Sequence, residues 1–230
     1  MKVQFSQSIS DINKEKWESI VGSDYPFLKY DFLLALESTN CVSKETGWSP
    51  FHLSVHESSE LIAVMPLYIK TDSQGEFIFD WSWADAYYRN GLDYYPKLVA
   101  SIPFTPATGP RLSIKKGQDR NKITNLINQE ISKISEEINL SSMHVLLPEK
   151  SEISAFLKSG LSLRTSYSFH WFNNEYKKFE DFLLDLTSRQ RKNLKKERKK
   201  IESQQIKIKR VLGREITDSM LESFYNFYQV

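Results

Sequence analysis

The sequence predicts a mixed α/β fold, in which an α+β mixed sheet carries helices on both faces. Three observations favour this class. Short apolar runs typical of strands alternate with helical segments in the order β-α-α-β-β-β-α-β-α-β. A long amphipathic helix lies between two such runs. The strand-helix-strand steps late in the chain favour parallel neighbours in the sheet.

The first 80 residues contain four expected strands and two expected helices, judged by their hydrophobic patterns. The strands are predicted over residues 2–5, 51–56, 61–69 and 77–79, and the helices over 14–20 and 31–38. Asp11 or Asn13 is expected to cap the first helix, because both residue types favour that position. Polar residues between the second and third strands predict a hairpin turn.

Residues 80–110 are predicted to form one extended, irregular loop. This stretch holds seven aromatic side chains and is interrupted by four prolines. Long loops without secondary structure are uncommon in compact domains, so a loop this rich in aromatic residues indicates a functional role.

The following residues give stronger signals. Asp119 is expected to cap a long helix whose apolar residues recur at spacings of three and four: Ile123, Leu126, Ile127, Ile131, Ile134 and Ile138. Strands are expected over residues 111–114, 143–147 and 161–171, the last from its alternating apolar residues. A short helix over residues 151–158 is expected to end at Gly160.

Composition excludes several classes of protein. The chain has 230 residues, enough for one large domain or for one domain and part of another. A single cysteine, Cys41, rules out an internal disulfide and a thiolate metal cage, and indicates a reducing compartment. His52 and His56 share a strand face but have no evident third ligand, so no metal site is expected. No apolar stretch is long enough for a signal peptide or a membrane span, which predicts a cytoplasmic protein.

The net charge of +2 hides a strong segregation. Residues 189–214 contain twelve Lys or Arg residues and only two Glu residues, while the rest of the chain is net acidic. The basic segment, residues 189–214, is therefore expected to bind an anion, whereas the rest of the chain is not. A uniformly basic nucleic-acid-binding domain is disfavoured.

Six stretches carry a family resemblance: GWSP (47–50), FDWSWADAY (79–87), YYPKL (94–98), PFTPATGPRL (103–112), FHW (169–171) and SRQRKN (188–193). In these stretches the chain resembles bacterial FemAB-like proteins, a peptidoglycan-linked acyltransferase group with a fold like that of Gcn5-related acetyltransferases. The resemblance implies an acetyltransferase-like half over residues 1–170. Residues 171–230 would then be a basic helical segment and the beginning of a truncated second half.

The resemblance also implies transfer of an acyl or aminoacyl group to an amine, possibly on a cell-wall precursor, without a metal. The donor is expected to be acyl-CoA or aminoacyl-tRNA, with no tightly bound cofactor. One departure concerns the loop that holds the coenzyme A pyrophosphate in acetyltransferases. Here residues 114–119 match that pattern only at Gly117, and the carboxylate of Asp119 would repel a phosphate.

The aromatic stretch is the candidate substrate cleft. We expect five residues in it to contact substrate: Trp83, Tyr95, Lys97, Thr105 and Arg111. Asp85 is the candidate base for an amine nucleophile, and His170 is a second catalytic candidate beside His144. The alternatives are that the aromatic rings only pack the loop onto the sheet, that Asp85 caps a loop, and that the histidines are structural.

The basic segment is predicted to begin as a helix capped by Ser188. Arg189, Arg191 and Lys192 then fall in its first turn, where the helix dipole disfavours cations. An anion such as a phosphate would explain this placement, whereas a solvated charged face is the alternative.

Two functions therefore stay open at the level of sequence. The chain is either an acyl- or aminoacyltransferase or a noncatalytic module of the same fold that holds a nucleotide-sugar, a peptide or a phosphorylated ligand. The expected partners are a small-molecule or cell-wall-precursor substrate and, as a donor, tRNA. A nucleic-acid-binding protein that works through the basic helix is a third and weaker reading, because the body is acidic.

Overall fold

The computed structural model describes residues 1–78, 80–167 and 169–229. The chain divides into two compact units, Met1–Thr165 and Ser166–Val230. Strands and helices alternate through the first unit, and helices of the second unit follow. The predicted mixed α/β class is thereby confirmed.

The first unit contains two four-stranded sheets where the sequence predicted one. The first sheet is antiparallel, in the order β1 (Lys2–Ser6), β3 (His52–Glu57), β4 (Glu60–Met65) and β7 (Ser113–Ile114). The second sheet is mixed, in the order β2 (Trp48–Pro50), β5 (Tyr68–Lys70), β6 (Lys97–Ala100) and β8 (Met143–Val145). Residues 61–69, expected as one strand, contribute to both sheets because Pro66 lies between β4 and β5.

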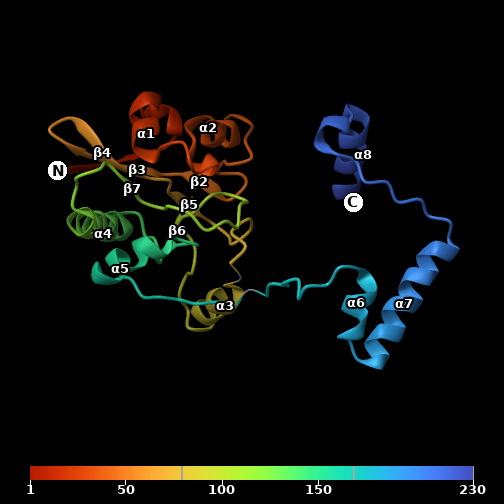
Figure 1. Ribbon diagram of the computed structural model, residues 1–230. Coiled ribbons are helices and arrows are strands. Elements are labelled where there is room, and N and C mark those ends of the chain that lie inside the picture. Colours follow the sequence, from red (N-terminus) through yellow and green to blue (C-terminus); the bar gives the residue numbers. More distant parts are fainter. Residues whose placement is uncertain (79, 168, 230) are drawn as a thin grey trace. The chain divides into compact units, whose positions relative to one another are not determined.

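Helices cover both sides of these strands, as predicted. Figure 1 shows α1 (Lys14–Val21) and α2 (Tyr30–Ser38) on one side, and α4 (Arg120–Glu137) and α5 (Lys150–Lys158) on the other. Short 3-10 turns over Ile9–Asp11 and Pro26–Leu28 lead into the first two helices. The parallel pairing of β6 with β8 agrees with the expected strand-helix-strand step through α4.

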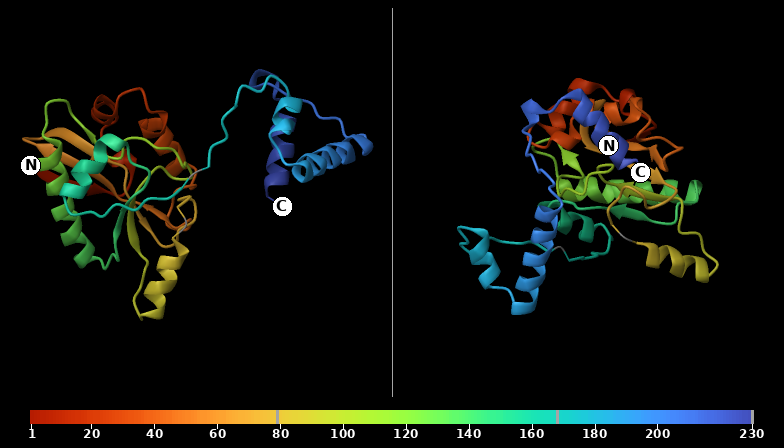
Figure 2. Two further views of the ribbon diagram at one scale, coloured as in Figure 1. Left: turned by 60° about the horizontal axis from the view of Figure 1, so that its bottom comes forward. Right: turned by 90° about the vertical axis from the view of Figure 1, so that its right-hand side faces the viewer.

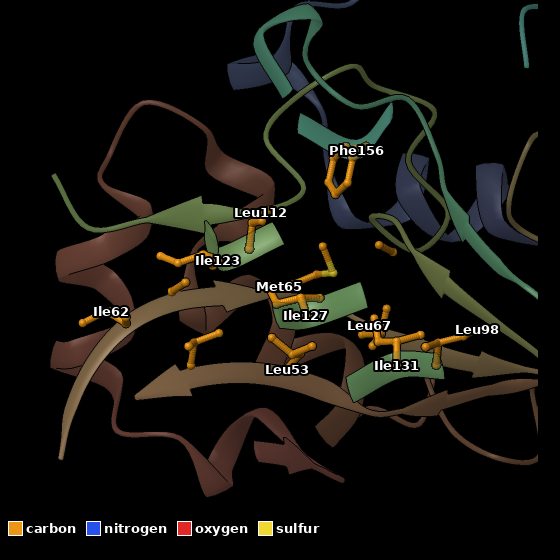
Figure 3. Packing of buried hydrophobic residues seen from close by; sticks show 13 residues of the cluster. Leu53, Ile62, Met65, Leu67, Leu98, Leu112, Ile123, Ile127, Ile131 and Phe156 are labelled. Atoms are coloured by element: carbon orange, nitrogen blue, oxygen red, sulfur yellow. The ribbon is translucent and has the colours of Figure 1, made fainter. Parts of the chain in front are cut away.

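The main core lies between the sheets and the α4 side. Ile123, Ile127 and Ile131 are fully buried along one stripe of α4. Figure 3 shows them gathered with Leu53, Met65, Leu98 and Phe156, from the strands and from α5. The amphipathic pattern therefore identified the packed face of this helix.

The helix caps follow the predicted chemistry. Asn13 Oδ1 accepts from the backbone N–H of Lys16 at 2.9 Å, and Asp119 Oδ1 accepts from that of Lys122 at 3.1 Å. Gly160 follows α5 with a φ of 105°, a conformation that favours glycine.

Three predicted elements are wrong. The stretch over residues 80–110 is not one irregular loop, because it contains helix α3 (Trp81–Arg89) and strand β6. Residues 161–167 and 169–171 form no strand, and the rings of Tyr167, Phe169 and Trp171 are largely exposed. Phe77 and Ile78 are not in a strand either; Phe79, like Ser168, lies outside the described residues.

Helix α3 is exposed in a way that explains the wrong prediction. All nine of its residues are described, and none of them is buried. In Figures 1 and 2 this helix (yellow) projects from the sheets of the first unit. Trp81, Trp83, Tyr87 and Tyr88 lie within about half of its circumference, and this exposed aromatic face, which four prolines follow in the chain, was interpreted as part of a loop.

The second unit contains α6 (Phe179–Leu184), α7 (Ser188–Ser203), a 3-10 turn (Gly213–Glu215) and α8 (Asp218–Tyr228). The expected cap of the basic helix is wrong by one residue. Thr187, not Ser188, caps α7: its side chain accepts from the backbone N–H of Gln190, and the Gln190 side chain accepts from that of Thr187.

Candidate functional site

A buried polar network lies where the chain leaves β5 and returns to β6. Residues 71–96 form an excursion between these strands and carry α3. Lys97, the first residue of β6, is fully buried. Its ammonium donates to Asp80 Oδ2 at 2.5 Å, to Glu76 Oε2 at 2.9 Å and to Ser73 Oγ at 3.0 Å.

The network continues through two tyrosines. Tyr94 Oη donates to Asp80 Oδ2 at 2.6 Å and lies 3.5 Å from His144 Nε2. Tyr95 Oη and Ser73 Oγ are 2.6 Å apart. The Lys97 ammonium also lies 5.2 Å and 5.6 Å from the two ring centroids, within cation–π range.

The sheet register brings His144 into this network. His144 on β8 pairs with Val99 on β6, and Val99 shares a sheet face with Lys97 because side chains alternate along a strand. His144 Nε2 lies 2.9 Å from Ser142 Oγ. Burial, with a further contribution from the nearby Lys97, lowers the pKa of His144 to about 4. The imidazole is therefore neutral at pH 7.

The carboxylates of the network differ in their acidity. Burial raises the pKa of Glu76, and the neighbouring Lys97 only partly offsets this. Burial also acts to raise the pKa of Asp80, but hydrogen bonds from Lys97 and Tyr94 outweigh it, so that the pKa is lowered. The pKa of Tyr94 is raised by burial and by its hydrogen bond to Asp80. Asp80 is thus the more acidic of the two carboxyls, and Tyr94 donates a hydrogen bond to it.

Each carboxylate has one oxygen without a partner. Among the side chains that the structure describes, Glu76 Oε1 and Asp80 Oδ1 are buried and form no hydrogen bond. Such groups are uncommon, because a buried carboxylate oxygen without a donor is costly. The two carboxylates therefore have more acceptor oxygens than the described side chains have hydrogen-bond donors for them.

A shallow depression on α3 adjoins the network. It is lined by Ser82, Trp83, Ala86, Tyr87, Asn90 and Leu92. Trp83 is 50% exposed, and the guanidinium of Arg164 lies 5.4 Å from its ring centroid. The Tyr87 ring meets the Tyr94 ring edge to face at 5.1 Å, which connects the depression to the buried network.

The structure does not bring all the predicted substrate residues to one surface. Lys97 and Tyr95 belong to the buried network, and Trp83 lies in the depression on α3. Arg111 is 1% exposed, and its guanidinium donates to the carbonyls of Leu146 at 2.7 Å and Ala107 at 2.5 Å. Thr105 Oγ1 donates to the carbonyl of Pro103 at 3.1 Å. The side chains of Arg111 and Thr105 thus donate their hydrogen bonds to backbone carbonyls of the chain itself.

The two catalytic candidates lie in different units. Asp85 is exposed on α3 and forms an ion pair with Arg89 one turn later. His170 is exposed in the second unit, where its ring stacks on that of Phe172 with centroids 6.2 Å apart. Neither side chain takes part in the buried network.

Arg189 and Arg191 fall in the first turn of α7, as predicted, and Lys192 is the residue that follows this turn. Arg191 Nη2 donates to the carbonyl of Leu186 at 3.1 Å, so this guanidinium folds back toward the start of the helix. Arg191 Nε is buried and has no partner within the described residues. The three cations thus crowd the positive end of the helix dipole.

The sequence reasoning missed Glu76, Asp80 and Tyr94 as site residues. Asp80 and Tyr94 lie inside the stretches that carry the family resemblance, and this was the only signal available for them. Nothing in the local sequence pattern of Glu76 predicted a buried carboxylate.

The described part of the chain shows neither a metal-binding cluster nor a membrane-spanning helix. No group of three or more His, Cys, Asp or Glu side chains there is arranged to hold a metal ion. No helix there combines the length and apolar character needed to cross a membrane.

Comparison with known proteins identifies the family. No curated protein matches the sequence. Similar solved structures include an aminoglycoside 6′-N-acetyltransferase of Acinetobacter haemolyticus, with 10% identity and a TM-score of 0.41 over 77% of this chain and 100% of that one. A ribosomal-protein-alanine N-acetyltransferase of Brucella melitensis biovar Abortus gives 9% identity and a TM-score of 0.41, over 75% and 99%. The model of the FemAB-like family, described as peptidoglycan biosynthesis/recognition, matches residues 8–230. The protein therefore belongs to the FemAB-like family.

Proposed function

We propose that this chain takes part in the transfer of an acyl or aminoacyl group to an amine acceptor of the cell-wall-precursor class. Family membership supports acyl transfer in a peptidoglycan-related context. The structural observation that carries the proposal is the neutral His144 joined through Tyr94 to the Asp80 carboxylate.

The hydrogen bonds favour one tautomer of His144. Tyr94 has a single hydroxyl proton and donates it to Asp80, so its oxygen is left to accept. With its proton on Nε2, His144 can donate to the hydroxyl oxygens of Tyr94 and Ser142, and its Nδ1 keeps a lone pair. This lone pair is the proton acceptor that we assign.

The reaction that follows is direct attack by an amine. The nitrogen of the acceptor forms a bond to the donor carbonyl carbon, and His144 Nδ1 takes the proton that the nitrogen loses. The C–S bond of a thioester or the C–O bond of an aminoacyl ester breaks, and the leaving group receives a proton. Asp80, acting through Tyr94, stabilises the imidazolium formed in between.

The donor is either acyl-CoA or aminoacyl-tRNA. The carboxylate of Asp119 accepts a hydrogen bond from the backbone of the first turn of α4. A donor pyrophosphate would have to accept hydrogen bonds from the N–H groups of this same turn. The cations in the first turn of α7 are the alternative holder of donor phosphate. Asp85 and His170 remain predictions for further catalytic roles.

The test is turnover with matched histidine variants. The wild-type chain is assayed with acetyl-CoA and with aminoacyl-tRNA against a UDP-linked cell-wall precursor that bears a free amine. His144→Asn should lower kcat by about 10²- to 10⁴-fold. His56→Asn is the control, because His56 is a partly buried histidine of β3 outside the network. Equal losses in both variants, or none in His144→Asn, would contradict the assignment.

A second candidate function is a noncatalytic binding module of the same fold, for a nucleotide-sugar, peptide or phosphorylated ligand. The capping role of Asp119 favours it, because it opposes phosphate binding at the start of α4. In this case one of these ligands raises the melting temperature while neither donor turns over.

A further inference from the structure

The two buried carboxylates of the network are short of hydrogen-bond donors. Glu76 is 4% exposed and Asp80 is 1% exposed. Each has one oxygen on the Lys97 ammonium, and Glu76 Oε1 and Asp80 Oδ1 have no partner among the described residues. Both carboxylates lie beside the Lys97 ammonium, so their two unpaired oxygens indicate a binding place for a further hydrogen-bond donor.

The local charge also leaves room for a second cation. Lys97 is the only ammonium within hydrogen-bond distance of either carboxylate among the described residues. Lys70, the other buried lysine nearby, is engaged elsewhere. Its ammonium donates to the carbonyl of Gln74 at 3.2 Å and lies 3.8 Å from the Trp48 ring centroid. Within hydrogen-bond distance the two carboxylates therefore share one ammonium, and the charge of Lys70 acts on Glu76 without a hydrogen bond between the two side chains.

The chemical surroundings suit an ammonium better than a neutral donor. The rings of Tyr94 and Tyr95 lie within cation–π range of Lys97. A cation beside Glu76 would also oppose the rise in the pKa of this carboxyl that burial causes. We propose that Glu76 Oε1 and Asp80 Oδ1 receive the primary ammonium group of the ligand. If the proposed function holds, this group is the acceptor amine, and its ammonium loses one proton to solvent before the neutral nitrogen attacks the donor carbonyl.

Access to the site runs through the excursion that carries α3. No residue of α3, all of which is described, is buried, and the helix projects from the sheets (Figure 2). Ser73, Glu76 and Asp80 connect the base of the excursion to Lys97 of β6 through polar contacts. Moving α3 breaks the contact between the Tyr87 and Tyr94 rings but uncovers no buried residue of the helix itself, and the ligand ammonium enters as it moves.

The experiment compares two probes of one shape, n-pentylamine and 1-pentanol, with the full chain at pH 7.5. We expect calorimetry to show binding of the amine and at least tenfold weaker binding of the alcohol. Glu76→Gln should weaken amine binding about tenfold, because it removes the charge and keeps an oxygen for Lys97. Asp31→Asn is the matched control: Asp31 is an exposed carboxylate that pairs with Lys14 at 2.6 Å. Its amine affinity should be unchanged.

A second measurement keeps the proposal testable if Glu76→Gln does not fold. In the wild-type chain, n-pentylamine should slow hydrogen exchange of the α3 amides, whereas 1-pentanol should not. Equal binding of both probes, equal loss in Asp31→Asn, or unchanged exchange in α3 would overturn the proposal. Turnover separates the two ideas: amine binding without transfer refutes only the proposed function. Transfer with an amine KM unaffected by Glu76→Gln refutes only the ammonium site.

Discussion

The ammonium of Lys97 lies 2.5 Å from Asp80 Oδ2, which joins the first residue of β6 to the residue that precedes α3. Both side chains are buried, at 0% and 1% exposure. The attraction between buried charges is offset by the cost of removing them from water. The pair is therefore better explained as a device that positions the excursion than as a source of net stability.

The first prediction concerns the loss of this ammonium. Lys97→Met leaves Asp80 and Glu76 buried without their cation, which should lower the free energy of unfolding by about 3–5 kcal/mol. Denaturant titration measures the change. Lys115→Met is the control, because Lys115 forms a surface ion pair with Glu60 and its loss should cost at most about 1 kcal/mol. Equal costs for the two variants would mean that the buried pair has no special role.

The second prediction concerns the pH dependence of stability. The pKa of His144 is about 4 in the folded chain and 6.5 as an ordinary value. Between these pH values the unfolded chain binds a proton that the folded chain does not, so stability falls as the pH drops from about 6.5 to about 4. NMR titration should show that His144 stays neutral above pH 5. His144→Gln should reduce the slope of stability against pH in this window, and an unchanged slope would contradict the prediction.

The elements predicted well from the sequence are those whose signals are local. The cap at Asp119 and the stripe through Ile123, Ile127 and Ile131 lie within one helix, so their spacing alone fixes the buried face. Helix α3 has an aromatic face, but its residues are not buried and the prolines that follow it favoured a loop. Residues 161–167 and 169–171 alternate like a strand, but their rings stay exposed and no neighbouring strand pairs with them in the described chain.

The candidate site was less predictable because its contacts are tertiary. Lys97 was expected to face substrate, and no local pattern indicated that Asp80 and Glu76, 17 and 21 positions earlier, would contact it. The contact between Tyr94 and His144 spans 50 positions and depends on the pairing of β6 with β8. Propensity and periodicity carry no information about such contacts.

The third prediction concerns Glu152 in α5. Its buried carboxylate accepts from the backbone N–H groups of Arg111 at 2.9 Å, Leu112 at 2.8 Å and Glu149 at 3.2 Å. Glu152→Ala leaves the N–H groups of Arg111 and Leu112 without an acceptor, whereas that of Glu149 also donates to the carbonyl of Gly109 at 3.1 Å. The free energy of unfolding should fall by about 3 kcal/mol. Glu130→Ala is the control, since Glu130 on α4 pairs with Lys133 at the surface. A cost below about 1 kcal/mol in Glu152→Ala would show that water replaces the carboxylate.

The last prediction concerns the cations at the start of α7. Arg189, Arg191 and Lys192 crowd the positive end of the helix dipole, which favours an anion there. Arg191 has a free Nε beside its bond to Leu186 and is the best placed of the three. Charge-assisted contacts to phosphate contribute about 1.5–3 kcal/mol each, so Arg191→Ala should weaken a phosphorylated ligand by about ten- to a hundredfold.

Lys199→Ala is the matched control, because Lys199 lies on the last turns of the same helix and outside the N-terminal turn. We expect it to change the affinity little, and we expect wild-type binding to weaken as salt rises, since part of the attraction is screened. Calorimetry with a nucleoside diphosphate and with tRNA, at two salt concentrations, measures both effects. Equal losses in the two variants would show that α7 attracts anions only through diffuse charge, and no loss in either would show that it is a solvated helix face.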